Sequence, residues 1–134
     1  MLDDLKLENI LFLDIETVPL TEELGSVSKH LQDLWDRKSS HFRKEEESAS
    51  DVWPRASLHA EFGRVVCISA GIISQKTDPK RFRIKSFSGE DESSILTGFS
   101  QLVSKFRSPA DIRLCAHNGN GFDFPFLCRR MLIK

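Results

Sequence analysis

The chain has 134 residues, of which 40% are hydrophobic and 29% are charged, and its formal net charge is −1. This length and composition are typical of one globular domain with a single core, and they exclude the disordered class. A net charge near zero excludes a strongly basic nucleic-acid binder, but not an enzyme that holds phosphodiesters through metal ions. No apolar run approaches the roughly 20 residues that span a bilayer, and the acidic amino terminus lacks a signal peptide's basic flank. We therefore expect a cytoplasmic protein without a membrane segment.

The first predicted element is a strand at residues 9–16, where an apolar run ends in acidic side chains and Pro19 follows. Because successive side chains of a strand point to opposite faces, Asp14 and Glu16 are expected on the same side. Apolar residues occupy both sides of the strand before these acids. This pattern predicts a central strand that is covered on both faces.

Residues 20–58 are predicted to form an insertion between strands. Apolar residues recur at helical spacing from Thr21 onward, with Thr21 near the helix cap. They are Leu24, Val27, Leu31 and either Leu34 or Trp35. The charged, serine-rich segment 36–51 is either a solvated extension of this helix or a mobile loop.

The insertion is also a candidate cover for a substrate groove. In that interpretation Arg43, Lys44 and Arg55 lie near phosphates and Trp53 lies under a base. Tryptophan is more often a packing residue, which is the alternative for Trp53.

The remaining elements alternate between strands and helices. Strands are expected at residues 63–74, 81–87 and 111–117, and helices at 90–106 and from Asp123 or Phe124 to the end. The first three strands can form an antiparallel meander, and the helix at 90–106 can bring the fourth strand in parallel beside the first. The predicted fold class is therefore α/β, with a mixed sheet and flanking helices.

Basic residues alternate with apolar ones along the third predicted strand. Arg81, Arg83 and Lys85 would share one face, which is ordinarily a solvated one.

The carboxylates of Asp14 and Glu16 are the first candidate functional groups. Two negative charges held two residues apart repel each other, and a bound divalent cation lets both stay ionised. Hard oxygen ligands without cysteine or histidine favour magnesium or manganese over zinc. The alternative is that a strand leaving the core simply ends in acidic residues.

The second candidate group is the segment HNGNGFDFPF at residues 117–126, which follows the fourth predicted strand. Its glycines allow a sharp turn, after which Asp123 lies at the start of a helix. Asp123 can be a simple N-cap there, with Pro125 in the first turn. The topology nevertheless places it at the sheet edge where two neighbouring parallel strands end, the same edge as Asp14 and Glu16.

Both segments resemble known motifs. LFLDIET resembles the first motif of the DEDD (DnaQ-like) superfamily of 3′-to-5′ exonucleases, and HNGNGFDFPFL resembles the second, in the form found in the proofreading domain of family B DNA polymerases. The resemblance implies a ribonuclease H-like fold. It also implies that Asp14, Glu16 and Asp123 bind two Mg²⁺ or Mn²⁺ ions, which activate a water that hydrolyses the phosphodiester at the 3′ end of DNA or RNA.

The same resemblance implies contacts with the substrate. Asn118 and Phe122 match positions that touch the terminal nucleotides of a single strand, and Thr17 and Val18 match positions that pack against its 3′ end. His117 is expected to be a hydrogen-bonding support residue rather than a general base, because the superfamily takes the residue that orients the water from a third motif.

That third motif, Tyr-x-x-x-Asp or His-x-x-x-x-Asp, supplies a fourth carboxylate in the superfamily. The sequence contains no tyrosine, and its four histidines all lie before or within the second motif. We therefore expect the domain to be incomplete at its carboxyl terminus, and these residues alone to cleave poorly or not at all. The alternative function is a non-catalytic ribonuclease H-like module that binds nucleic acid.

Overall fold

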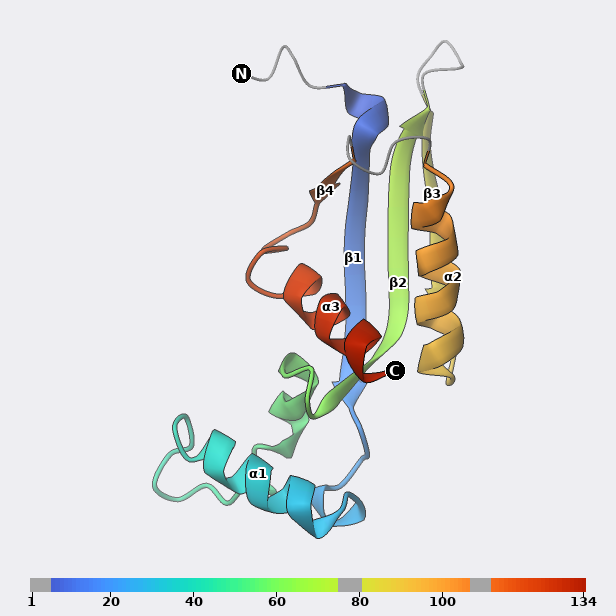
Figure 1. Ribbon diagram of the computed structural model, residues 1–134. Coiled ribbons are helices and arrows are strands. Elements are labelled where there is room, and N and C mark those ends of the chain that lie inside the picture. The colour runs from blue at the N-terminus through green and yellow to red at the C-terminus, as the bar shows by residue number, and fades with distance from the viewer. Residues whose placement is uncertain (1–5, 75–80, 107–111) are drawn as a thin grey trace.

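The computed structural model describes residues 6–74, 81–106 and 112–134, which form a four-stranded sheet with helices packed against it (Figure 1). The strands are β1 (Ile10–Pro19), β2 (Gly63–Ser74), β3 (Arg81–Ser88) and β4 (Arg113–Cys115). The α-helices are α1 (Lys29–Ser39), α2 (Glu92–Ser104) and α3 (Asp123–Ile133), and three short 3-10 helices are η1 (Leu7–Asn9), η2 (Leu24–Ser26) and η3 (Trp53–Leu58). None of the helices in these described ranges is long and apolar enough to cross a membrane.

The sheet has the order β3-β2-β1-β4. β1 pairs with β2 and β2 with β3 in antiparallel fashion, whereas β4 lies parallel to β1. The predicted α/β class, the meander and the parallel fourth strand are therefore confirmed. β4 is shorter than expected, since it pairs with β1 only over Ile10–Phe12, and Asp111 of the predicted strand lies outside the described residues.

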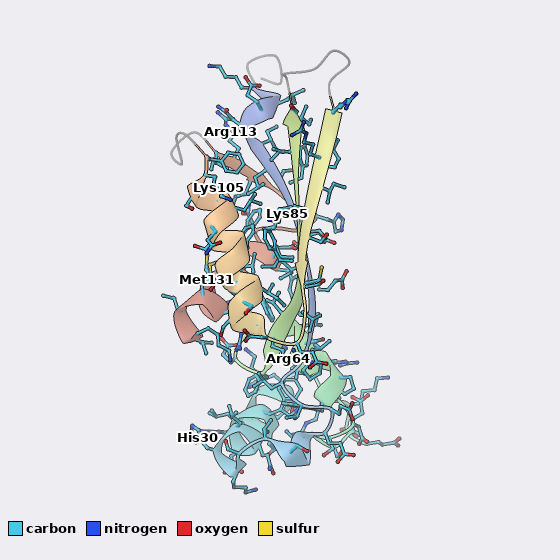
Figure 2. The ribbon with its side chains drawn as sticks, turned by 90° about the vertical axis from the view of Figure 1, so that its right-hand side faces the viewer. His30, Arg64, Lys85, Lys105, Arg113 and Met131 are labelled. Carbon is cyan, nitrogen blue, oxygen red and sulfur yellow. The ribbon has the colours of Figure 1, made fainter. Side chains whose placement is uncertain are left out.

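One face of the sheet holds the main core. Leu11, Leu13 and Ile15 of β1 point toward α2 and α3 and are at most 6% exposed. Figure 2 shows both helices on the same side of the sheet. The prediction that β1 is covered on both faces was wrong, because both helices lie on this one side, and on the other side Phe12 is only half-buried and Asp14 and Glu16 are exposed. We call this other side, with Phe12, Asp14 and Glu16, the open face.

The basic residues of β3 behave as an ordinary solvated set. Arg81, Arg83 and Lys85 are all exposed, and the Lys85 ammonium lies 4.7 Å from the centre of the Phe87 ring.

The insertion has an aromatic core of its own. The Trp35 and Trp53 side chains are 0% and 2% exposed, and their rings meet edge to face at 5.4 Å. The Trp53 indole nitrogen donates a hydrogen bond of 2.8 Å to the carbonyl of Thr21. Trp53 is therefore a packing residue, and the idea that it lies under a base was wrong. Arg43, proposed beside a phosphate, instead forms an ion pair of 2.8 Å with Asp36.

The helix of the insertion begins later than predicted. Ser28 caps α1 by accepting a hydrogen bond from the backbone N–H of Leu31, whereas the Thr21 hydroxyl donates to the carbonyl of Glu23. Leu24 and Val27 still belong to the aromatic core, although they precede the helix. Apolar spacing alone did not reveal the break, because a 3-10 turn can bury the same side chains.

A buried ion pair fixes α3 against the rest of the domain. Arg130 of α3 donates to the Glu92 carboxylate of α2 (Nε to Oε1, 2.8 Å) and to the carbonyl of Ala60 (3.0 Å). Glu92 also accepts the backbone N–H of Val65 at 2.8 Å, and both charged side chains are 3% exposed. Burial by itself raises the pKa of Glu92, but the Arg130 and Val65 hydrogen bonds and the charges of Arg130 and Lys134 bring the pKa below its ordinary value.

This ion pair was not predicted, although the sequence contains a pattern that indicates it. Glu92 lies on the apolar stripe of α2 with Ile95, Leu96 and Phe99, and Arg130 lies on the stripe of α3 with Phe126 and Leu127. An acid and a base on two buried stripes of one core are expected to pair, because an unpaired buried charge is costly.

Candidate active site

The open face of β1 presents the first two carboxylates. Asp14 lies opposite Ser69 of β2 and Glu16 opposite Cys67. The two acids are two residues apart on one strand, so their α-carbons are about 7 Å apart. The buried neighbours Leu13 and Ile15 anchor the same stretch of backbone from the other side. A rigid strand therefore holds two exposed carboxylates in a fixed orientation.

Asp123, the first residue of α3, approaches β1 from its other edge. β4 pairs with β1 only as far as Phe12, and beyond that point the Asp123 carboxylate accepts a hydrogen bond from the backbone N–H of Ile15. The side chain is only 3% exposed. The structure thus brings the carboxylate of the second motif to the strand that carries the first.

Electrostatics link Asp123 to Asp14. Burial raises the pKa of the Asp123 carboxyl, and the nearby negative charge of Asp14 raises it further. The backbone N–H groups of Asp123 and Ile15 and the charge of His117 act in the opposite direction without cancelling the rise. A carboxyl whose ionisation is opposed by burial and by a neighbouring negative charge is one that a bound divalent cation would stabilise.

The donor set fits a hard cation, but it does not form a closed cage. Among the residues that the structure describes, no group of three or more histidine, cysteine, aspartate or glutamate side chains is placed to hold a metal ion. Asp14 is near enough to Asp123 for its charge to raise the pKa of that carboxyl, while Glu16 lies two residues further along the open face of β1. Carboxylate oxygens are the ligands that Mg²⁺ and Mn²⁺ prefer, so the residues fit these ions by chemistry and charge.

A tight turn precedes Asp123. Asn118 has a φ of 53°, in the left-handed region, and its carbonyl accepts the backbone N–H groups of Gly121 and Phe122. A β-carbon at position 121 would lie 2.5 Å from the Asn118 side-chain oxygen. Glycine at 121 therefore lets the Asn118 amide fold back over the turn. Asn118 is exposed, whereas Phe122 is half-buried and packs 5.4 Å from the Phe126 ring.

The residues that follow the first motif lie beside the insertion. The Thr17 hydroxyl donates a hydrogen bond of 2.8 Å to the carbonyl of Ser57, so it ties β1 to η3. Val18 contributes to the wall of a cleft of about 580 Å³. The other lining residues of this cleft are Pro19, Leu20, Thr21, Glu22, Pro54 and Arg64.

A mixed sheet of this order, with acids within its central strand and on the adjoining helix, is typical of ribonuclease H-like α/β domains, which include nucleases. A comparison with protein-family models matches residues 56–134 to a family described as a predicted 3′-5′ exonuclease related to the exonuclease domain of PolB. The chain belongs to this family. The match contains Asp123 and its turn, whereas Asp14 and Glu16 precede it. No curated protein and no solved structure matched the chain.

Proposed function

We propose that this chain carries metal-binding carboxylates of a 3′-to-5′ exonuclease that hydrolyses phosphodiesters at the 3′ end of DNA or RNA. The observation that carries the proposal is the position of Asp123, buried at the edge of β1 and next to Asp14. A carboxylate at that place is costly to bury, because burial opposes its ionisation, and a bound cation would offset this cost. Membership of an exonuclease-related family supports the same reaction class.

In this function Asp14, Glu16 and Asp123 hold two Mg²⁺ or Mn²⁺ ions. The bound ions would supply activation of the attacking water and stabilisation of the leaving 3′ oxygen. The Ile15 N–H holds the Asp123 carboxylate at the edge of β1, and the strand keeps Asp14 and Glu16 on one side. The protein's own contribution is therefore to hold like charges together before the cations arrive.

The substrate is a single strand with a free 3′ end, and the product is a nucleoside 5′-monophosphate. Asn118 and Phe122 on the turn, and Val18 in the cleft, are the proposed contacts with the terminal nucleotides. Thr17 would contact the substrate only through its methyl group, since its hydroxyl is bonded to Ser57. His117, exposed and close enough to affect Asp123, supports that carboxylate.

The test compares Asp14→Asn with Asp33→Asn, which removes an exposed carboxylate on α1, far along the chain from the proposed ligands. Manganese should raise the melting temperature of the unmodified chain and of Asp33→Asn by several degrees, because a ligand that binds only the folded state stabilises it. Asp14→Asn should lose this response. In a nuclease assay, Asp14→Asn should also stop the manganese-dependent shortening of a 5′-labelled oligonucleotide. Unchanged shortening would contradict the proposal.

A second candidate function is a non-catalytic module that binds nucleic acid. It is favoured by the observation that no three metal-binding side chains of the described residues cluster. In that case the oligonucleotide would bind equally well to Asp14→Asn and to the unmodified chain, and manganese would not change either melting temperature.

A further inference from the structure

A small polar pocket of about 100 Å³ lies where the insertion meets the start of α3. The insertion side contributes Lys38 of α1 and His59, together with Glu61 just beyond it. The α3 side contributes Arg129 and the turn at residues 121–126, the same turn that carries Asp123. The pocket is thus joined through one short segment to Asp123, one of the proposed metal ligands.

The charged groups around this pocket are Lys38, His59, Glu61 and Arg129. Lys38 and Arg129 are exposed, and the Arg129 guanidinium lies 3.9 Å from the Glu61 carboxylate. Both of those side chains are more than half exposed, so their ion pair is weak, and another anion can replace Glu61 beside Arg129. Two cations against one acid leave the pocket with a net positive charge.

His59 lines this pocket and packs against the aromatic core of the insertion. The His59 ring stacks on the Phe42 ring with their centres 5.9 Å apart, and it meets Trp35 edge to face at 5.8 Å. The Arg55 guanidinium also lies over the Phe42 ring, 5.8 Å from its centre. Burial lowers the pKa of His59, and the positive charge of Lys38 lowers it further against the opposing effect of Glu61. A neutral imidazole at this position still has one N–H to donate.

We infer that this pocket binds one backbone phosphate of the single strand whose 3′ end lies at Asp14 and Asp123, an inference that rests on the proposed function. A lysine ammonium and an arginine guanidinium on opposite walls are the groups that recognise phosphate oxygens. The volume and polar lining suit a phosphate rather than a base. Because Lys38 belongs to the insertion, the insertion serves to guide the strand toward the carboxylates.

The experiment measures binding of a fluorescent oligothymidylate to the intact chain in EDTA, by anisotropy at several salt concentrations. The test variant is Lys38→Gln/Arg129→Gln. The matched control is Lys29→Gln/Lys105→Gln, which removes the same total charge from exposed positions on α1 and just after α2, outside the pocket. Losing one phosphate contact should weaken binding about fivefold near 0.1 M salt and reduce the slope of log K against log salt by about 0.7. Equal affinities and slopes for the two double variants would overturn the inference.

Glu61→Gln gives a second test with the opposite sign. It removes the acid that competes with the phosphate, so binding should become tighter, which loss of folding could not produce. Weaker or unchanged binding would count against the pocket. The same measurements separate this inference from the proposed function. Binding that depends on Lys38 and Arg129, without manganese-dependent hydrolysis, would reject the nuclease function and support the phosphate site. Hydrolysis that needs Asp14, together with binding that ignores Lys38 and Arg129, would remove only the phosphate site.

Discussion

The two sides of β1 differ in almost every property although they belong to one strand. Leu11, Leu13 and Ile15 are sealed under α2 and α3, whereas Asp14 and Glu16 stand on an exposed surface. Because successive side chains of a strand point to opposite faces, adjacent residues of β1 can contribute to the core and to the candidate site. The helices on the covered side hold the strand still, and this immobility keeps two like charges aligned. Substitutions on the two sides should therefore have separable effects.

The largest effect on stability is expected from the ion pair that joins the covering helices. Glu92→Gln leaves the Arg130 guanidinium buried without its counter-charge and should lower the free energy of unfolding by about 3–5 kcal/mol. Urea unfolding followed by circular dichroism measures this change. The double variant Glu92→Gln/Arg130→Met removes the stranded charge and should recover part of the loss. A double variant less stable than Glu92→Gln would show that the pair acts mainly through packing.

A smaller effect is expected within β1 itself, where adjacent residues can be compared directly. Leu13→Ala opens a cavity under the helices and should cost about 2–5 kcal/mol. Phe12→Ala, on the open face, loses mainly its edge-to-face contact with Phe82 at 5.4 Å and should cost about 1 kcal/mol. Equal losses in urea unfolding would mean that the open face is covered in solution.

The smallest expected effect is the change in folding stability at low pH. Folding favours the charged form of Glu92, whose pKa is held below its ordinary value of 4.5. Its contribution to stability is therefore complete above that value and is lost as the pH falls through the lower pKa of the folded state. The stability difference between the unmodified chain and Glu92→Gln should shrink below pH 4.5, while the difference for Leu13→Ala should not. A gap that stays constant in urea titrations down to about pH 3 would contradict the assignment.

Much of this architecture follows from local pattern. The bounds of β2 at Gly63–Ser74 match the prediction, because a long β-branched run between glycine and polar residues has few alternatives. The start of α3 at Asp123 follows from the proline and acid of its first turn. The bounds of these elements depend on residues that are close in the sequence, so the sequence alone is enough to predict them.

The errors arose where the partner is distant in the sequence. Apolar Ile10 and Phe12 could not reveal that both helices choose the same side of β1, since that choice depends on the path of the crossover. The break at Ser28 was hidden because Leu24 and Val27 serve the aromatic core from outside the helix. The contact between Asp123 and β1 could be anticipated as a shared edge, but its hydrogen bond to the Ile15 N–H required the early end of β4.

The antiparallel pair of β1 and β2 contains one unmatched residue. Glu16 pairs with Cys67 and Thr17 with Val65, so Val66 has no partner across the ladder, and its carbonyl bonds to Gly89 instead. This one-residue offset changes which residues of β2 face the core. Cys67 lies across from Glu16 of the open face, whereas Val65, two residues earlier, is buried in the core. Insertion or deletion of one residue in this pair of strands should therefore be more disruptive than most single substitutions, since it would move every following side chain to the opposite face of the sheet.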